Sequence, residues 1–373
     1  MLGNTGEVSS LPSPDPDEPP RRPRGLLYKL GVTLAAFVVG LCGCEFGVRL
    51  LGLAPPPHPE ARGNLFQPSS DPIQRFENRP GGSQRILYRD APGERARVVW
   101  MAVNSQGFRG PTVSRKKPAE TFRIACVGDS HTFGHGVAAC DTWPAELSAI
   151  LGARFPDRNI EVINCGVENY DTMQEYIWLR DKVLDFSPDL VVMQFFVNDA
   201  RAQDLPREPV RRDWIIRLSH PSRDGLVRRL RDASRLADLV LDGVWRRHGL
   251  AIFSDLHSEF YREPRAEWLR VQSALRSTRD ELAGRGIGYG LALYPFLVRS
   301  GEHLTSYECF EVVKAFCVEE GIRVLDAEPA FLASDVDSLR NSPHDFHGNP
   351  EANRIFATAV ADWLVAEGLL TSG

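Results

Sequence analysis

From residue 122 onward, short apolar runs alternate with segments of helical periodicity. Within the runs apolar residues fill successive positions, as is typical of parallel strands that are buried on both faces. The first run, RIACV, ends just before a Gly-Asp-Ser turn. Strands are therefore expected at residues 123–127, 161–164, 189–196, 288–294 and 323–325.

Segments with apolar residues at every third or fourth position separate these strands. Residues 142–155 are one example, with Trp143, Leu147 and Leu151 on one side. Strands that alternate with helices predict an α/β fold, here a three-layer α/β/α sandwich with a parallel sheet of about five strands. Such sheets bind ligands beyond the carboxyl ends of their strands. Further helices are expected at residues 172–186, within 205–286, at 304–320 and at 350–367.

The N-terminal part of the chain has a different pattern. Residues 1–25 are rich in proline and acidic residues, which predicts a disordered tail. No charged residue occurs between positions 30 and 44, and leucines extend the apolar character on both sides, so we expect a membrane-spanning helix over residues 26–53. Glu45 and Arg49 are four residues apart and can pair on one face of that helix.

Charges around this segment predict its orientation. Basic residues precede it, and the positive-inside tendency then places the tail in the cytoplasm and the rest of the chain in the periplasm or at the cell surface. A cleaved signal peptide, lipidation at the LCGC sequence and a buried core helix are alternatives. We read residues 54–120 as an irregular linker and lead-in that packs on a main domain at 121–368. The basic residues are Arg21, Arg22, Arg24 and Lys29.

Composition narrows the functional classes. The chain has 373 residues, is 43% hydrophobic and carries a formal net charge of −5. These are globular proportions, and the absence of a basic excess argues against a nucleic-acid partner. The Arg-rich run at 207–231 is interpreted as a solvated face, with binding to an acidic glycan or to lipid headgroups as the alternative.

Polar residues follow three of the expected strands, and one late loop carries more. Because parallel strands end at the same sheet edge, a doubly wound topology brings all of these residues together. They are Asp129 and Ser130 after the first strand, Gly166 after the second, Asn198 and Asp199 after the third, and His344, Asp345 and His347 in the loop before the last helix.

These residue types suit acyl transfer. A serine hydroxyl is a weak nucleophile until a base takes its proton, and His347 is the candidate base for Ser130. Asp345 is placed to orient the imidazole. Backbone N–H groups of Ser130 and Gly166 and the side-chain amide of Asn198 would supply an oxyanion hole. Asp129 and Asp199 are interpreted as supporting residues that hydrogen-bond loop N–H groups.

The set resembles the SGNH hydrolases, the GDSL-type esterase superfamily. The serine, glycine, asparagine and histidine of that superfamily fall on Ser130, Gly166, Asn198 and His347, in the same order, and the resemblance covers residues 122–364. It implies a flavodoxin-like fold and ester hydrolysis or acyl transfer without a metal. The Gly-Phe-Arg sequence at 107–109 and the N-terminal apolar segment are similar to those of membrane-anchored bacterial members.

Three positions depart from the superfamily pattern. His131 follows the serine where leucine is common, and Phe196 stands where glycine is expected and could narrow the acyl site. Many members place the acid three residues before the histidine, but that position is His344 here. Since other members use a two-residue spacing, we take Asp345 as the acid and His344 as a supporting residue.

The sequence leaves three functional hypotheses. The first is a membrane-anchored serine esterase that acts on an ester substrate of the cell envelope, such as an O-acylated polysaccharide or a lipid. The second is an O-acyltransferase with little hydrolysis, and the third is a non-catalytic polysaccharide-binding protein on the same fold. No cofactor is expected. Histidines near the site raise the alternative of a metal, but their spacing does not clearly supply a tetrahedral zinc site; they are His131, His135 and His344.

Overall fold

The computed structural model describes six stretches of the chain. The chain divides into two compact units, residues 1–53 and 54–373, and each is described by itself. The expected tail at 1–25 lies outside the described residues except for its last position, as does most of the Arg-rich run. The described residues are 25–53, 60–88, 95–200, 226–244, 259–262 and 265–370.

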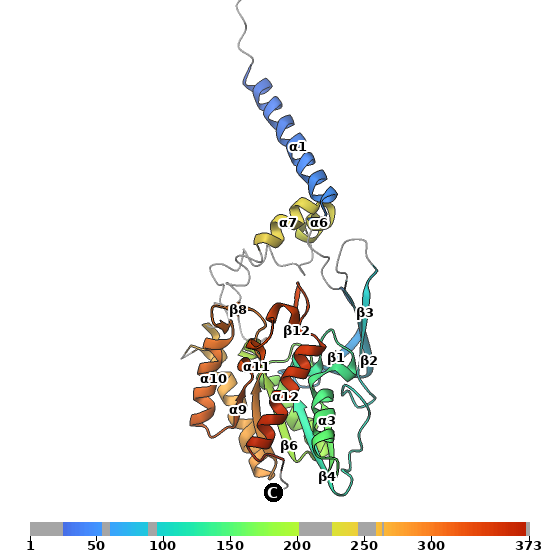
Figure 1. Ribbon diagram of the computed structural model, residues 1–373, viewed down its shortest axis with the longest axis vertical. Helices are drawn as coiled ribbons and strands as arrows, with labels where there is room; N and C mark the ends of the chain where they lie inside the picture. The colour runs from blue at the N-terminus through green and yellow to red at the C-terminus, as the bar shows by residue number, and fades with distance from the viewer. Residues whose placement is uncertain are drawn as a thin grey trace, which may run out of the picture. The chain divides into compact units, whose positions relative to one another are not determined.

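The first unit contains one described helix, α1 (Leu26–Leu50), drawn in blue in Figure 1. Its 25 residues span about 37 Å at 1.5 Å per residue, more than the roughly 30 Å of a bilayer's hydrocarbon core. Arg49 Nε donates to Glu45 Oε1 at 2.6 Å, the pairing that their spacing predicts. By length and composition α1 can cross a membrane, although an N-terminal signal sequence meets the same criteria.

The second unit is built on a five-stranded parallel sheet, as the sequence predicts. The order of the strands is β10-β7-β6-β4-β5, so β4 lies between β5 and β6. The chain therefore reverses its direction across the sheet after β5, and this is the switch point where such sheets bind ligands. The strands are β4 (Thr121–Val127), β5 (Asn159–Asn164), β6 (Leu190–Phe195), β7 (Gly288–Leu293) and β10 (Val324–Asp326).

Helices cover both faces of this sheet and complete the α/β/α sandwich. On one face α3 packs against α12, and on the other α4 and α10 pack against α9. Trp143 of α3 meets Phe356 of α12 at a ring distance of 5.3 Å, and Figure 1 shows these two helices side by side. The helices are α3 (Trp143–Arg154), α4 (Thr172–Asp181), α9 (Ala266–Gly284), α10 (Tyr307–Glu319) and α12 (Pro350–Ala366).

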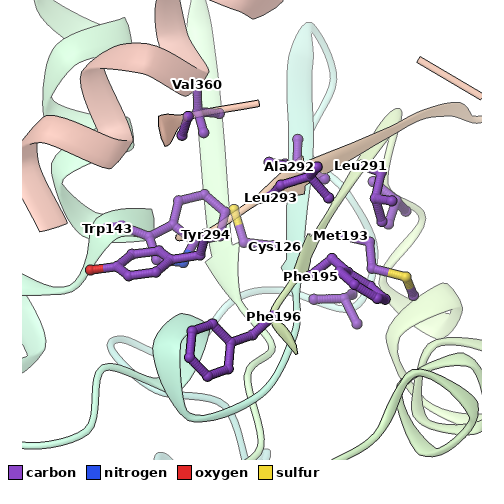
Figure 2. Packing of buried hydrophobic residues seen from close by; sticks show 14 of the residues in the cluster. Cys126, Trp143, Met193, Phe195, Phe196, Leu291, Ala292, Leu293, Tyr294 and Val360 are labelled. Atoms are coloured by element: carbon purple, nitrogen blue, oxygen red, sulfur yellow. The ribbon is translucent and has the colours of Figure 1, made fainter. Parts of the chain in front are cut away.

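The core lies between the sheet and these two helical layers. Every residue of β4 and of β6 is buried, which explains why both strands are mostly apolar in sequence; the exceptions are Thr121, Arg123 and Gln194. Figure 2 shows Met193 and Phe195 of β6 on one side of the sheet and Trp143 and Tyr294 on the other. Gly290 gives α12 access to the sheet, since a Cβ at this position would lie 2.2 Å from the ring of Trp363.

Three strands between residues 60 and 102 form an antiparallel sheet, so the expectation of an irregular lead-in is wrong for these strands. One face of the sheet packs Ile86, Tyr88 and Met101 against Phe133 of the main domain, while the other face exposes polar residues together with Val98 and Trp100. Half-buried strands of this kind lack the long apolar runs that mark the main sheet. The strands are β1 (Glu60–Pro68), β2 (Phe76–Tyr88) and β3 (Arg97–Ala102).

Shorter helices, 3₁₀ turns and hairpins connect the main elements. The expected helix at 172–186 is split into α4 and a 3₁₀ turn, η2 (Val183–Phe186), which ends at Ser187 in the left-handed region. The described helices between residues 205 and 286 are α6 (Leu226–Ala233), α7 (Arg235–Val244) and α9. The remaining elements are α2 (Ser130–Phe133), η1 (Ala139–Asp141), η3 (Val197–Ala200), α11 (Glu328–Leu332), η5 (Val336–Leu339), β8 (Arg299–Ser300), β9 (His303–Leu304), β11 (Arg340–Ser342) and β12 (Asp345–Gly348). The division of the chain into tail, anchor, lead-in and catalytic domain stays a prediction.

Candidate active site

The turn after β4 places Ser130 at the first position of the short helix α2. Asp129 caps this helix by accepting a hydrogen bond from the N–H of His131 at 2.9 Å. Gly128 permits the tight turn, because a Cβ there would lie 2.3 Å from Thr132 Oγ1. The Ser130 side chain is therefore held at the carboxyl end of a central strand, with 8% of the residue exposed.

The structure brings together Ser130, His347 and Asp345. Ser130 Oγ lies 2.9 Å from His347 Nε2, and His347 Nδ1 lies 2.6 Å from Asp345 Oδ1. Because Nδ1 faces a carboxylate, it carries the ring proton of a neutral His347, and Nε2 is left to accept the serine proton. The three side chains thus have the connectivity that nucleophilic catalysis by serine requires.

The hairpin β11–β12 fixes the relation between Asp345 and His347. Asp345 Oδ1 accepts a hydrogen bond from the backbone N–H of His347 at 3.1 Å as well as from its ring. A spacing of two residues therefore suffices to bring the carboxylate to the ring. His344 stands at the position where many members of the superfamily have the acid. Its Nδ1 lies 3.5 Å from Asp242 Oδ1 of α7.

Electrostatics keep Asp345 ionised. Burial by itself would raise the pKa of this carboxyl, but the neighbouring His347, His135 and Tyr88 together lower it below its ordinary value. Asp345 is 7% exposed. It can therefore hold the Nδ1–H of His347 and stabilise positive charge on that ring.

Gly166 and Asn198 lie at the sheet edge that the sequence predicts, after the two strands that flank β4. The Gly166 N–H, expected to be an oxyanion donor, donates to Asn164 Oδ1 at 3.0 Å. A Cβ at Gly166 would lie 2.2 Å from the backbone nitrogen of Phe133, so this glycine allows β5 to approach α2. Its role as an oxyanion donor stays a prediction, whereas its role in packing is visible.

Asn198 lies in η3 with its side-chain amide toward Asp129. Burial raises the pKa of Asp129, and hydrogen bonds from the His131 N–H and from Asn198 oppose this shift. An amide nitrogen carries two hydrogens, so one can donate to Asp129 while the other remains for a developing oxyanion.

Asp199 has a structural contact next to the site. Its Oδ2 accepts a hydrogen bond from the Phe196 N–H at 2.9 Å, which closes the turn after β6. Burial and the nearby carboxylate of Asp129 raise the pKa of Asp199 well above its ordinary value. Asp129 and Asp199 thus both accept hydrogen bonds from loop N–H groups, as the sequence predicts.

Three imidazole rings stack at the site. The ring of His347 lies 4.9 Å from that of His131 and 4.4 Å from that of His135. Burial and the neighbouring imidazoles lower the pKa of His131 well below its ordinary value, so this ring is neutral. Two of the three departures from the superfamily pattern pack against each other, since the rings of His131 and Phe196 are 4.2 Å apart.

Sequence reasoning missed three residues that reach Asp345 directly or through a neighbour: Tyr88, His135 and Glu168. Tyr88 OH donates to Asp345 Oδ2 at 2.5 Å, and His135 Nδ1 donates to Glu168 Oε1 at 2.5 Å. His135 was considered only as a possible metal ligand, and no local motif marks the other two. A tyrosine at the end of an alternating strand is indistinguishable in sequence from an ordinary core residue.

One group of described residues could hold a metal ion: His135, Asp345 and His347, whose ligand atoms lie within 4.8 Å of one another. It differs from the histidine set considered from the sequence, because Asp345 and His347 take part in it. These atoms hydrogen-bond within the site, and a metal would displace the proton that His347 Nδ1 shares with Asp345.

Comparison with known proteins identifies a family that the chain matches. The model of the GDSL-like lipase/acylhydrolase family matches residues 126–355, more than half of the chain. No curated protein matches the chain.

Solved structures with a similar fold include a G-D-S-L family protein from Desulfitobacterium hafniense DCB-2 (17% identity, 65% of this chain and 99% of that one, TM-score 0.39). A second is an alpha/beta hydrolase from the metagenome of Lake Arreo, Spain (19% identity, 67% of this chain and 97% of that one, TM-score 0.40). A third is an acetylxylan esterase from Geobacillus stearothermophilus (16% identity, 65% of this chain and 94% of that one, TM-score 0.41). At these identities and TM-scores we draw nothing from them about substrate. The family match assigns the chain: it belongs to the GDSL-like lipase/acylhydrolase family of the SGNH superfamily and is a hydrolase of ester bonds.

Proposed function

We propose that the protein is a serine esterase in which Ser130, His347 and Asp345 form the catalytic triad. The observation that carries this proposal is the hydrogen-bonded series from Ser130 Oγ to His347 Nε2 at 2.9 Å and from His347 Nδ1 to Asp345 Oδ1 at 2.6 Å. A binding protein would need a pocket but no base within reach of a serine hydroxyl.

The chemistry proceeds in two halves. Ser130 Oγ attacks the ester carbonyl carbon as its proton moves to His347 Nε2, and the tetrahedral intermediate expels the alkoxide, which takes that proton. Water then attacks the acyl-Ser130 ester, with His347 again accepting a proton and returning it to Ser130 Oγ. Ionised Asp345 stabilises the imidazolium at each of these steps.

Two groups stabilise the oxyanion in this proposal. The first is the backbone N–H of Ser130, because Ser130 is the first residue of α2 and the first N–H groups of a helix have no partner within it. The second group is the amide of Asn198, which follows the neighbouring strand β6. Gly166 is a third donor only if its N–H leaves Asn164 Oδ1 when substrate binds.

A fluorophosphonate probe tests this assignment, since it reacts covalently with an activated serine. We expect labelling of the wild type, none of Ser130→Ala, and full labelling of the control Ser338→Ala, whose hydroxyl is exposed and donates to the Asp335 carbonyl. Well-folded wild-type protein that takes no label would favour a non-catalytic binding protein. Acyl transfer to a glycan hydroxyl in large excess over release into water would favour the O-acyltransferase hypothesis.

The cellular setting belongs to the same proposal. We propose that residues 26–53 anchor the protein in a membrane with the N-terminus in the cytoplasm and the catalytic unit outside, where an O-acylated polysaccharide or a lipid of the envelope would be its substrate. The length of α1 and the basic residues before it support this. Protease added to intact spheroplasts should then digest the catalytic unit. If the catalytic unit is protected until the cells are lysed, it lies in the cytoplasm and the proposed orientation is wrong.

A further inference from the structure

We propose that Tyr88, His135 and Glu168 form a second group of positioning residues, which holds Asp345 through its Oδ2 and so keeps Oδ1 aligned with His347. This inference rests on the proposed function, because it concerns how the proposed acid of the triad is held. It adds to the site a residue from the three-stranded sheet and a second histidine–carboxylate pair.

Tyr88 is the last residue of β2 and is 2% exposed. Its hydroxyl donates to Asp345 Oδ2 at 2.5 Å, while Oδ1 of the same carboxylate faces His347. Burial, the Asp345 charge and their hydrogen bond raise the pKa of Tyr88, so the phenol remains a donor at every physiological pH. The contact depends on Gly136, where a Cβ would lie 2.1 Å from the Tyr88 oxygen.

His135 reaches the same carboxylate oxygen from another direction. Its Nε2 lies 3.8 Å from Asp345 Oδ2, and its Nδ1 donates to Glu168 Oε1 at 2.5 Å. The backbone of His135 is fixed as well, because its carbonyl accepts a hydrogen bond from Asn341 Nδ2 at 2.8 Å. The arrangement repeats the histidine–carboxylate geometry of the triad, but with no nucleophile at its free end.

His135 is a cation at neutral pH. Burial by itself lowers its pKa, but the charge and hydrogen bond of Glu168, together with Asp345, more than offset this and raise the pKa to about 9. The pKa of Glu168 is lowered, because His135, His347 and Arg109 outweigh its burial. The titratable and charged groups facing His135 are Glu168, Asp345, Arg109, His131 and His347.

This arrangement has one consequence for catalysis. A carboxylate held at both oxygens cannot rotate away from the His347 ring, so Oδ1 stays aligned with Nδ1. The triad is thereby held in the geometry in which His347 Nε2 can accept the serine proton.

The experiment measures kcat and KM for p-nitrophenyl acetate hydrolysis by the full-length protein, with kcat referred to active sites counted by titration. Its variants are Tyr88→Phe and His135→Gln, with Tyr307→Phe on α10 as the matched control and Ser130→Ala as the test of the proposed function. We expect Tyr88→Phe to lower kcat about tenfold with little change in KM. His135→Gln should also lower kcat, by a smaller factor, with little change in KM. Tyr307→Phe should behave as wild type.

The outcomes separate the two proposals. If Ser130→Ala keeps wild-type turnover, the proposed function fails. If Ser130→Ala is inactive but Tyr88→Phe and His135→Gln retain the wild-type kcat, only the second positioning group is overturned. A purely structural role would lower the number of titratable active sites and leave kcat per active site unchanged, which also overturns it. Should Tyr88→Phe fail to fold, the kcat of His135→Gln per active site decides.

Discussion

Replacing Asp345 by asparagine isolates the role of its charge while it preserves the shape of the side chain. The carboxylate accepts three hydrogen bonds, from the ring and the backbone N–H of His347 and from the hydroxyl of Tyr88. An asparagine has only one oxygen, so its NH₂ group must face one set of these donors. If the oxygen stays with Tyr88, the NH₂ group faces His347 Nδ1 and favours the tautomer with the proton on Nε2.

That tautomer cannot accept a proton from Ser130. A loss of about 10⁴-fold in kcat is expected from the wrong tautomer, equivalent to about 5.4 kcal/mol of transition-state stabilisation. The assay is initial-rate hydrolysis of p-nitrophenyl acetate, with folding monitored by circular dichroism. His344→Asn is the matched control, because its ring faces Asp242 of α7, and it should keep kcat within a few-fold of wild type. The reasoning is refuted if Asp345→Asn retains a tenth of the activity, or if His344→Asn loses as much.

Three further predictions address the oxyanion hole, the charge of His135 and the anchor. Asn198→Ala should lower kcat about 10²–10³-fold in steady-state assays with little change in KM, and an unchanged kcat would remove Asn198 from the oxyanion hole. The folded-state pKa of His135, about 9, lies above the ordinary value of 6.5, so its contribution to stability is complete below pH 6.5 and is lost as the pH rises through 9. Chemical denaturation should therefore show wild-type stability falling between pH 7 and 10, and a smaller fall in His135→Gln; equal falls would contradict the charged pair with Glu168. Deletion of residues 1–53 should leave a soluble, active enzyme, because residues 54–373 form their own compact unit, whereas aggregation in gel filtration would assign 26–53 to the core.

The sequence predicts the parallel sheet well because β4 and β6 are buried at every position and are therefore mostly apolar in sequence. It also predicts the order of the site residues along the sheet edge, because parallel strands present their carboxyl ends together. Asp345 and His347 can be paired from sequence, since they are two residues apart in one hairpin. In each case the information is local or follows from the regularity of the fold.

The remaining features depend on long-range contacts that leave no local pattern. Tyr88 and Asp345 are 257 residues apart in the chain, and an alternating strand such as β2 does not reveal which buried residue meets the site. The choice of Asn164 Oδ1 as acceptor for the Gly166 N–H depends on the turn geometry after β5. The close approach of that turn to α2, which requires glycine, becomes visible only in three dimensions.

The central claim is that the Ser130 hydroxyl carries the acyl group during turnover, and rapid acid quenching followed by peptide mass spectrometry tests it directly. Full-length protein mixed with p-nitrophenyl acetate for milliseconds should yield one acetylated peptide, with the acetyl group on Ser130, and the signal should decay as the substrate is exhausted. Ser338→Ala should give the same adduct, and Ser130→Ala none. An acetyl group that forms and turns over on another residue, or continued hydrolysis by Ser130→Ala, would contradict the account.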